Sequence, residues 1–287
     1  MIPFSFNIHG RLVEFDQPAV MGIINVTDDS FYDGSRAITK AEIAAKAAEM
    51  LEQGTDIIDI GACSTRPGSS PVSKDVELER LEKAIAAVRD AVGDKAILSV
   101  DTFRAEVAKK AVAEWGADMV NDISGGTLDN DMFSTVATLK CPYVLMHMRG
   151  TPETMQSNTA YDNVTVDVIK ELSFRVSRLR DIGVADIIVD PGFGFSKTLE
   201  QNYELLCNIE AFKILECPIL VGVSRKSMIT RLLDIKAEEA AIPTAILGAY
   251  ALEHGTSILR VHDVALASQT VKLLNAINHD MICSQSV

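Results

Sequence analysis

An aspartate ends one of the most apolar stretches of the chain, IIVDPGFGF, which covers residues 187–195. Removing a carboxylate from water at the end of a buried strand is costly unless hydrogen-bond donors replace the water. Either the fold or a bound ligand must therefore supply donors to Asp190. This residue is the first candidate for ligand binding.

Polar side chains also stand at the ends of other apolar runs: Asn25, Asp101, Asn121, Asp122, His147, Ser224, Arg260 and His262. For any single position, the simple alternative is a cap of the following helix, and this alternative is strongest for Asp122 and Asp263. A whole set of such residues is harder to explain as caps, because each one carries a cost of burial.

Several of the candidate residues are basic, although the chain as a whole is acidic. They are Arg66, Lys226, Arg260 and His262. Positive charge gathered at one mouth would attract an anionic substrate. The nucleotide-binding motifs G-x-x-x-x-G-K-[ST] and, after the first strand, G-x-G-x-x-G are absent, so the anion need not be a nucleotide.

Eight apolar runs alternate with segments of helical composition and must position these residues. The runs are VMGIIN (20–25), DIIDIG (56–61), AILSVD (96–101), DMVND (118–122), YVLMHM (143–148), DIIVD (186–190), PILVGVS (218–224) and ILRVH (258–262). Strands that alternate with helices form a parallel sheet, because parallel neighbours need a crossover. The pattern predicts an α/β fold, a TIM barrel of eight strands, with its chemistry at the C-terminal strand ends.

The two ends of the chain carry their own predictions. Residues 3–16 alternate around His9-Gly10, so residues 1–17 are expected to form an N-terminal β-hairpin over the closed end of the barrel. Residues 280–287 are expected to fray. No linker or composition shift interrupts the sequence, and residues 1–287 are therefore expected to form a single domain.

Composition excludes several classes of partner. The net charge of −13 and the pI of about 4.8 oppose binding to nucleic acid or to an anionic membrane surface. The five cysteines are widely spaced and form no C-x-x-C motif, so neither a disulfide framework nor a zinc site is expected. A secretory signal and apolar runs of about 18 residues are absent, and a cytoplasmic location is expected.

Two long loops follow the first two predicted strands, NVTDDSFYDGS (25–35) and GACSTRPGSSPVS (61–73). Their length and their content of Gly, Ser and polar residues are typical of mobile lids that order around a ligand. An ordinary surface loop is the alternative for each of them.

Together these loops and strand ends resemble the signatures of one enzyme family, the dihydropteroate synthases. The matching motifs, in order, are NVTDDSF, GACSTRPG, SVDTFRAEVA, VNDISGG, MHMRGTPETMQ, VDPGFGF, GVSRKSM and RVHDV. The resemblance runs from about Val20 to Ala276. Two positions depart from the family pattern, since Asp28 replaces a usual Pro and Cys63 a common Glu.

The resemblance implies condensation of 6-hydroxymethyl-7,8-dihydropterin pyrophosphate with p-aminobenzoate, giving 7,8-dihydropteroate and pyrophosphate for folate biosynthesis. It also implies a sulfonamide target. A pterin presents an exocyclic amine beside a ring N–H, and a carboxylate accepts such parallel donors as a fork. Asp190 would be that acceptor. Pyrophosphate would leave first, and an ionised Asp101 would stabilise the remaining pterin cation.

The site residues that the resemblance implies fall into overlapping sets. Catalytic residues would be Asn25, Asp101, Lys226 and Arg260, with Asn25 holding Mg²⁺ on the pyrophosphate. The pterin would contact Asp101, Asn121, Ile123, Met146, Asp190, Phe195, Gly222, Lys226 and Arg260. Pyrophosphate would contact Asn25, Asp33, Thr65, Arg66, Arg260 and His262. The aminobenzoate would contact Phe31, Arg66, Pro67, Phe195, Ser224 and Lys226. The family forms homodimers, and helices at about 238–253 and 263–277 are expected to form the interface.

Other interpretations of the sequence, as a different enzyme or as a binding protein, remain open. A pterin-binding methyltransferase barrel would share the Asp/Asn/Asp pocket but would not need the STRPG and SRKS loops. A Schiff-base aldolase is disfavoured because Lys226 follows a strand instead of lying inside one. A metal hydrolase is disfavoured because His147 has no H-x-H partner. A non-catalytic pterin-binding relative would bind the substrate without releasing pyrophosphate.

Overall fold

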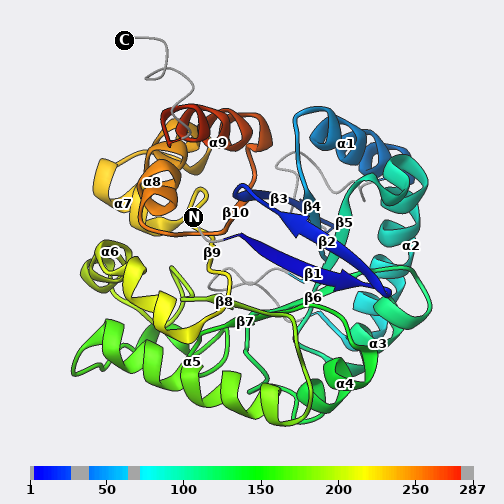
Figure 1. Cartoon of the computed structure of the whole chain (residues 1–287), viewed down its shortest axis with the longest axis horizontal. Helices are drawn as coiled ribbons and strands as arrows, with labels where there is room; N and C mark the ends of the chain where they lie inside the picture. Colours follow the sequence, from blue (N-terminus) through cyan, green and yellow to red (C-terminus); the bar gives the residue numbers. More distant parts are fainter. Residues whose placement is uncertain (1–2, 27–38, 64–71, 279–287) are drawn as a thin grey trace.

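Eight parallel strands form the centre of the molecule, and helices surround them (Figure 1). The computed structural model describes residues 3–26, 39–63 and 72–278. The strands are β3 (Ala19–Asn25), β4 (Ile57–Gly61), β5 (Ile97–Asp101), β6 (Met119–Asp122), β7 (Tyr143–Met146), β8 (Ile187–Asp190), β9 (Leu220–Val221) and β10 (Ile258–Val261). They pair in the order β8-β7-β6-β5-β4-β3-β10-β9, and a parallel bridge between Val189 and Ile219 closes the ring. The predicted barrel and its eight strands are confirmed.

The predicted helical segments form the outer layer. Within the described residues the helices are α1 (Lys40–Glu52), α2 (Lys74–Val92), α3 (Ala105–Ala113), α4 (Met132–Leu139), α5 (Val164–Asp181), α6 (Leu199–Cys207), α7 (Ser227–Leu233), α8 (Ala241–Glu253) and α9 (Val264–Asn278). Local sequence explains some of the starts, because Thr39 with Glu42 and Thr198 with Gln201 form capping boxes.

The predicted N-terminal hairpin covers the closed end of the barrel (Figure 1). Strands β1 (Phe4–Ile8) and β2 (Arg11–Phe15) pair antiparallel, and His9 and Gly10 turn with φ of 50° and 86°. Positive φ at both turn residues suits a two-residue hairpin. Three hairpin side chains are buried against the starts of the barrel strands: Phe6, Ile8 and Phe15.

Side chains along the barrel strands alternate between the interior and the helical layer, as the pleat requires. The lowest interior layer is apolar and contains Ile57, Ile97, Met119, Val144, Ile188, Leu220 and Ile258. Two residues further along each strand, the interior positions are Asp59, Ser99, Asn121, Met146, Asp190, Gly222 and Arg260. The interior thus changes from apolar to polar within one layer, and this change places the candidate residues below the open mouth.

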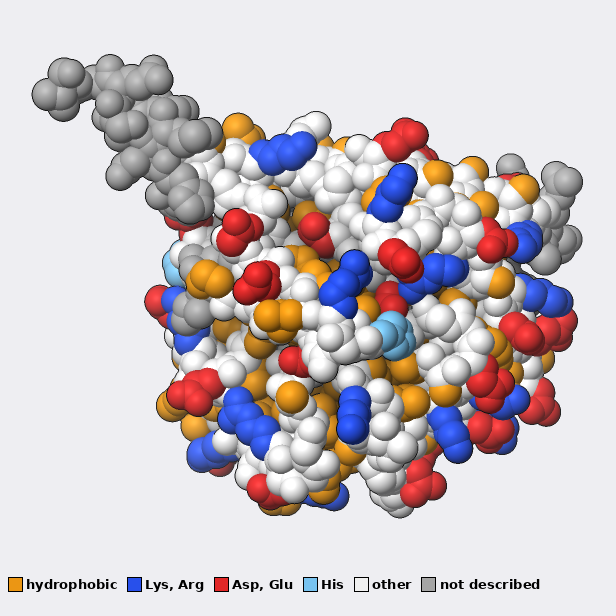
Figure 2. All heavy atoms as spheres, turned by 45° about the vertical axis from the view of Figure 1, so that its right-hand side comes forward, with side chains coloured by type: hydrophobic (Ala, Val, Ile, Leu, Met, Phe, Trp, Pro, Cys, Tyr) orange, Lys and Arg blue, Asp and Glu red, His pale blue; other side chains and the backbone are white. Residues whose placement is uncertain are grey.

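The outer surface carries mixed charges and a few exposed apolar side chains. On the face in Figure 2, acidic and basic side chains are interspersed instead of forming single-sign patches. In the described ranges, we find no helix with the length and apolar character needed to cross a bilayer. Helices α8 and α9 expose several apolar side chains: Ile242, Ile246, Leu273 and Ile277.

Candidate active site

Arg260 lies between two carboxylates inside the mouth of the barrel. Its Nε donates to Asp59 Oδ2 at 2.7 Å, and its Nη2 donates to Asp101 Oδ2 at 2.8 Å. Asn121 Nδ2 donates to the same Asp59 oxygen at 2.9 Å. Burial raises the pKa of Asp101, and the charge of Arg260 acts in the opposite direction. One hydrogen-bonded cluster therefore brings together three of the predicted residues, from β5, β6 and β10.

Asp59 is a member of this cluster that was not predicted, because only the strand ends were searched for polar residues. Its side chain is fully buried, and its Oδ1 has no hydrogen-bond partner among the described residues. Its Oδ2 accepts a hydrogen bond from one N–H of Asn121. A carboxamide offers an acceptor and two donors. The Asn121 carbonyl oxygen and second N–H have no partner among the described residues, so both are available to a ligand.

Asp190 ends β8 and is held by the loop that follows. Its Oδ1 accepts the Gly192 N–H at 2.7 Å, which is the one donor to this carboxylate found in the described residues. Burial raises the pKa of Asp190, and the charge of Lys226 lowers it. The fold thus supplies only part of the hydrogen bonding that a buried carboxylate needs, and a ligand with N–H donors would supply the rest.

Lys226 follows β9 and reaches over the same loop. Its Nζ donates to Phe193 O at 2.5 Å and lies 4.7 Å from the centroid of the Phe195 ring, a cation–π contact. Burial lowers the pKa of Lys226 to about 8. A Cβ at Gly222 would lie 4.0 Å from Lys226 Nζ and 3.8 Å from Arg260 Cβ, so this glycine lies between the two cations.

An apolar cluster adjoins these polar groups. Three predicted pterin contacts, Ile123, Met146 and Phe195, are buried together in it. Four further members were not predicted: Phe103, Leu128, Met148 and Met155. By contrast, Phe193 is fully buried in the main core outside the barrel wall, where it serves packing. The site therefore has one apolar wall and one charged side.

The anion-binding candidates lie toward β3 and β10. Ser224 Oγ lies 2.9 Å from His262 Nδ1 and accepts the His262 backbone N–H at 3.1 Å. Burial, together with the charges of Arg260, Arg225 and Lys46, lowers the pKa of His262 to about 3. Several cations therefore act on one imidazole, as expected for a site that receives an anion.

Two histidines, fully buried His147 and partly buried His262, predict acid sensitivity. The pKa of His262 is about 3 and that of fully buried His147 is lowered to about 4 by burial and the Lys197 charge. The pKa of histidine in an unfolded chain is about 6.5. Below that pH the unfolded chain binds more protons, so the folded state loses stability as pH falls, by about 1 kcal/mol per pH unit for each histidine.

Urea unfolding between pH 7.5 and 5 tests this expectation. The slope of unfolding free energy against pH should be smaller in His147→Asn and His262→Asn than in the parent chain. Equal slopes in all three proteins would contradict it.

Some predicted residues and interpretations need separate comment. Phe31, Asp33, Thr65, Arg66 and Pro67 lie outside the described residues. The cap interpretation of Asp122 is wrong, because its carboxylate accepts the Ser124 and Gly126 N–H groups and the Tyr143 hydroxyl, while α4 begins at Met132. Asp263 forms two hydrogen bonds with Arg225, the shorter at 2.7 Å.

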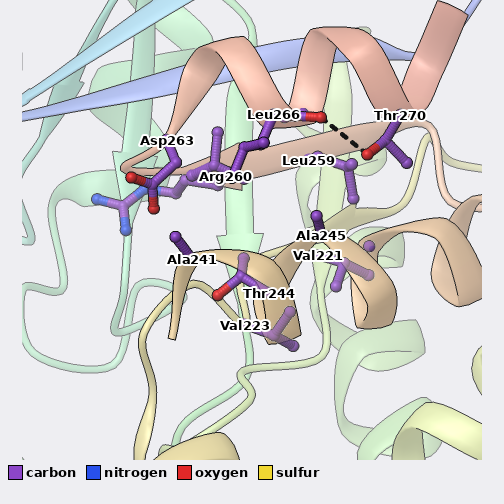
Figure 3. Close-up of a pocket in the computed structure, with 13 residues that line it drawn as sticks. Val221, Val223, Ala241, Thr244, Ala245, Leu259, Arg260, Asp263, Leu266 and Thr270 are labelled. Atoms are coloured by element: carbon purple, nitrogen blue, oxygen red, sulfur yellow. Dashed lines mark hydrogen bonds between the residues drawn. The ribbon is translucent and has the colours of Figure 1, made fainter. Parts of the chain in front are cut away.

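The cavity shown in Figure 3 is distinct from the site. It lies behind β9 and β10 under α8 and α9, and its volume of about 10 Å³ holds at most one water. Side chains such as Val221 and Leu259 line it. Arg260 borders it, but its guanidinium extends away from the gap (Figure 3) to Asp59 and Asp101. This gap is packing space.

A comparison with known protein families agrees with the geometry of this site. The family described as "Pterin binding enzyme" matches residues 21–262, a range that includes every cluster residue named above. The barrel and its polar interior layer therefore define a pterin-binding enzyme.

Individual relatives narrow this class. A dihydropteroate synthase of Synechocystis sp. is 43% identical over 261 residues, which cover 90% of this chain and 89% of the relative. That of Haemophilus influenzae is 38% identical over 93% of this chain and 97% of its own. The crystal structure of the Yersinia pestis synthase has a TM-score of 0.89 at 34% identity and covers 96% of this chain and 100% of its own. The chain belongs to the dihydropteroate synthase family.

Proposed function

We infer that this enzyme condenses 6-hydroxymethyl-7,8-dihydropterin pyrophosphate with p-aminobenzoate, releasing pyrophosphate and forming 7,8-dihydropteroate. The observation that carries the inference is the polar interior layer, in which buried carboxylates retain unused acceptors beside two cations. Structures of the Xanthomonas albilineans synthase contain 4-aminobenzoic acid and 7,8-dihydropteroate. They are a substrate and the product of this reaction.

Recognition of the pterin follows from the donors and acceptors of the ring. Asp190 accepts the exocyclic amine and the neighbouring ring N–H, while the free carbonyl and N–H of Asn121 meet the adjoining edge. Ile123, Met146 and Phe195 enclose the ring faces, and Gly222 leaves space beside Lys226 and Arg260. Both cations contribute to the pocket, with Lys226 toward the polar edge of the pterin.

Asp59→Asn is expected to weaken both the fold and pterin binding. Arg260 Nε and Asn121 Nδ2 both donate to Asp59 Oδ2, so the amide oxygen can take that place and keep both bonds. The amide nitrogen then occupies the position of Oδ1, where the described residues offer no acceptor, and the negative charge that pairs with Arg260 is lost. An unpaired buried donor costs about 1–3 kcal/mol. Urea unfolding measures the first effect, and calorimetry with the pterin substrate measures the second. Asp90→Asn, at an exposed ion pair with Lys40, is the control. Unchanged pterin affinity in Asp59→Asn would exclude an orienting role for Asp59.

Catalysis requires stabilisation of the charge that develops when pyrophosphate leaves. The pterin that remains is a cation delocalised over the ring and the exocyclic methylene, and we propose that an ionised Asp101 stabilises that charge. Burial raises the pKa of Asp101 to about 7, and the charge of Arg260 opposes this rise and favours the ionised form. The amine of p-aminobenzoate then attacks the methylene carbon, forms the C–N bond and loses a proton.

Binding of the pyrophosphate leaving group needs positive charge, and it needs a protein ligand for the metal ion. Arg260 and His262 supply the first from β10 and the residue that follows it, and Thr65, Arg66 and Asp33 are proposed to complete the pyrophosphate site. Asn25 Oδ1 lies beside Gly61, where an added Cβ would be 3.4 Å away. A hard oxygen donor of this kind suits Mg²⁺, which usually combines few protein ligands with substrate phosphates. When bound, Mg²⁺ neutralises charge on the pyrophosphate.

The p-aminobenzoate site adjoins the pterin site. Phe195 and Lys226 form one side of it, and Ser224 is proposed to lie near the carboxylate; Phe31, Arg66 and Pro67 complete the set. The Yersinia pestis synthase was solved with a sulfonamide drug. We propose that sulfonamides occupy the same place in this enzyme.

Release of pyrophosphate tests the function directly. The pterin pyrophosphate is incubated with the enzyme, with and without p-aminobenzoate, and release is followed by a coupled assay. The synthase should release stoichiometric pyrophosphate and form dihydropteroate when both substrates are present. Tight pterin binding with no release would identify a non-catalytic binder, and methyl transfer from a methylated pterin would identify the methyltransferase alternative.

A homodimer through α8 and α9 is the proposed assembly. Ile242 and Ile246 are 68% and 63% exposed, and Leu273 and Ile277 are each 67% exposed. Residues four apart lie on one helix face, so these side chains form apolar stripes on adjacent helices. Ile246→Glu should convert the dimer to a monomer in light scattering, whereas Leu12→Glu on the hairpin should not. A dimer that survives Ile246→Glu would contradict this interface.

The cysteines support the proposed cytoplasmic location. Cys63, Cys141, Cys207 and Cys217 are free thiols, and burial raises the pKa of both Cys63 and Cys141 to about 12, which keeps them unreactive. Free thiols are typical of a reducing compartment.

A further inference from the structure

A buried lysine with no role in the reaction described above contacts the loop that carries Phe195. Lys197 is 4% exposed. Its Nζ donates to Gly192 O and Phe195 O, each at 3.0 Å, and lies 3.1 Å from His147 Nδ1. Burial lowers the pKa of Lys197 to about 7, and the charge of Asp190 opposes this shift. The protonated amine has three N–H donors, and these three acceptors use all of them. A lysine placed in this way is fixed on every side.

The loop from Asp190 to Lys197 depends on such support. Its backbone is left-handed at Gly192, Gly194 and Ser196, with φ of 74°, 81° and 48°. Ser196 adopts this conformation at a steric cost, and a Cβ on Gly192 would collide with the His147 carbonyl oxygen. Two of the three Lys197 acceptors are carbonyls of this loop. The Lys197 ammonium therefore offsets a backbone conformation that is unfavourable by itself.

The support reaches Asp190 through a single residue. Gly192 accepts from Lys197 with its carbonyl oxygen and donates its own N–H to Asp190 Oδ1. The His147 backbone N–H donates to Asp190 O at 2.9 Å, which joins β7 to the same point. A displacement of Gly192 would therefore change the direction in which the Asp190 carboxylate points.

The contacts of His147 continue to the helical layer. Because Nδ1 accepts from Lys197, the ring proton lies on Nε2, which donates to Glu171 Oε2 at 3.1 Å. Partial burial would raise the pKa of Glu171, but hydrogen bonds from His147 and Arg149 lower it to about 2. Glu171 therefore stays ionised, and Glu171, His147 and Lys197 form a continuous chain from α5 to the loop.

We propose that Lys197 is a positioning residue of the pterin site, which holds Gly192 and Phe195 so that the Asp190 carboxylate and the Phe195 ring meet the substrate. His147 fixes Lys197 by accepting its third N–H. The proposal rests on the function inferred above, because Asp190 is taken as the pterin acceptor. In this proposal Lys197 acts through Gly192 and Phe195 and needs no contact of its own with the substrate.

Lys197→Met tests the proposal, with exposed Lys109→Met on α3 as the control. An acceptor that is displaced leaves buried donors of its ligand unpaired, and each unpaired donor costs about 1–3 kcal/mol, where about 1.4 kcal/mol is a tenfold change in affinity. We expect the pterin dissociation constant, measured by calorimetry, and KM for the pterin pyrophosphate to rise by roughly 10- to 100-fold. The change in kcat should be smaller, because a residue that binds the ground state and the transition state alike affects KM and not kcat. Unchanged pterin affinity in folded Lys197→Met would overturn the proposal.

A second pair of variants keeps Lys197 in place. His147→Asn retains an acceptor near the position of Nδ1, whereas His147→Leu removes it. Pterin affinity should be weaker in His147→Leu and near the parent value in His147→Asn, although both lose the contact with Glu171. Equal pterin affinity in the two variants would overturn the proposal. Because calorimetry needs no turnover, a failure of the synthase assay in the parent enzyme is a separate result.

Discussion

Asp190→Asn is expected to lower affinity for the pterin substrate by roughly 100-fold while the fold is retained. The carbonyl oxygen of the new side chain can still accept the Gly192 N–H, which now bonds Asp190 Oδ1 at 2.7 Å. The amide nitrogen must then face the N–H donors of the ligand. A buried donor that meets a donor costs about 1–3 kcal/mol, and more when a charge is also lost. Each tenfold in affinity corresponds to about 1.4 kcal/mol.

The same strand provides the matched control. Asp186 lies just before the start of β8, at the closed end of the barrel, where its Oδ2 accepts the Asn7 N–H at 2.9 Å. Asp186→Asn keeps an acceptor for that bond and lies away from the mouth. It should bind the pterin like the parent enzyme in calorimetry. Near-parent affinity in Asp190→Asn would show that another group accepts the N–H donors of the pterin.

The barrel and much of its polar layer were predictable from sequence for a physical reason. Strands buried on both faces appear as near-continuous apolar runs, and the first polar residue after each run marks the strand end. This rule found Asp101, Asn121 and Asp190. It also selected Asp122, which is one position further along and points out of the barrel, to Tyr143. Position after a run does not reveal which way a side chain points.

Asp59 shows what the same rule missed. It lies inside the run DIIDIG, two residues before Gly61, and the period of two along a strand places both on the interior face. A search by period instead of by strand end would have found it. The run also contains Asp56, which bonds the Val20 N–H at 2.8 Å at the start of the strand. Only the fold distinguishes the two aspartates.

Lys197 had no comparable signal in the sequence. Lysine is rarely buried, and the GFGFSK segment is typical of an ordinary loop that leads into a helix. The reason for its burial is His147, which lies 50 residues away in sequence. Burial of a cation is understandable only when its acceptors are known, and here they are two backbone carbonyls and an imidazole from another strand.

Lys226 and Arg260 look equivalent in the motifs, but their surroundings differ. Lys226 Nζ bonds a backbone carbonyl, Phe193 O, and lies over an aromatic ring. Arg260 instead pairs with Asp59, whose side chain is 0% exposed, and with Asp101, whose side chain is 14% exposed. Removal of Lys226 leaves a carbonyl oxygen without its partner and takes away a charge that lowers the pKa of Asp190, but it breaks no direct ion pair. Removal of Arg260 leaves two enclosed carboxylates without the cation that bonds them directly.

Lys226→Ala is therefore expected to lose most of its turnover with a small change in stability, and Arg260→Ala to lose both. Breaking a buried ion pair from one side costs about 3–5 kcal/mol, because the remaining charge is uncompensated. The double variant Asp59→Asn, Arg260→Ala should regain part of this stability, since one of the unpaired charges is gone, yet it should remain inactive.

Urea unfolding and steady-state kinetics on the four proteins, including the parent, test these expected changes in stability and turnover. If Lys226→Ala lost stability in parallel with turnover, its role would be structural. If the double variant were no more stable than Arg260→Ala, the unpaired Asp59 charge would not be the cause of the loss, and the ion cluster would need a different account.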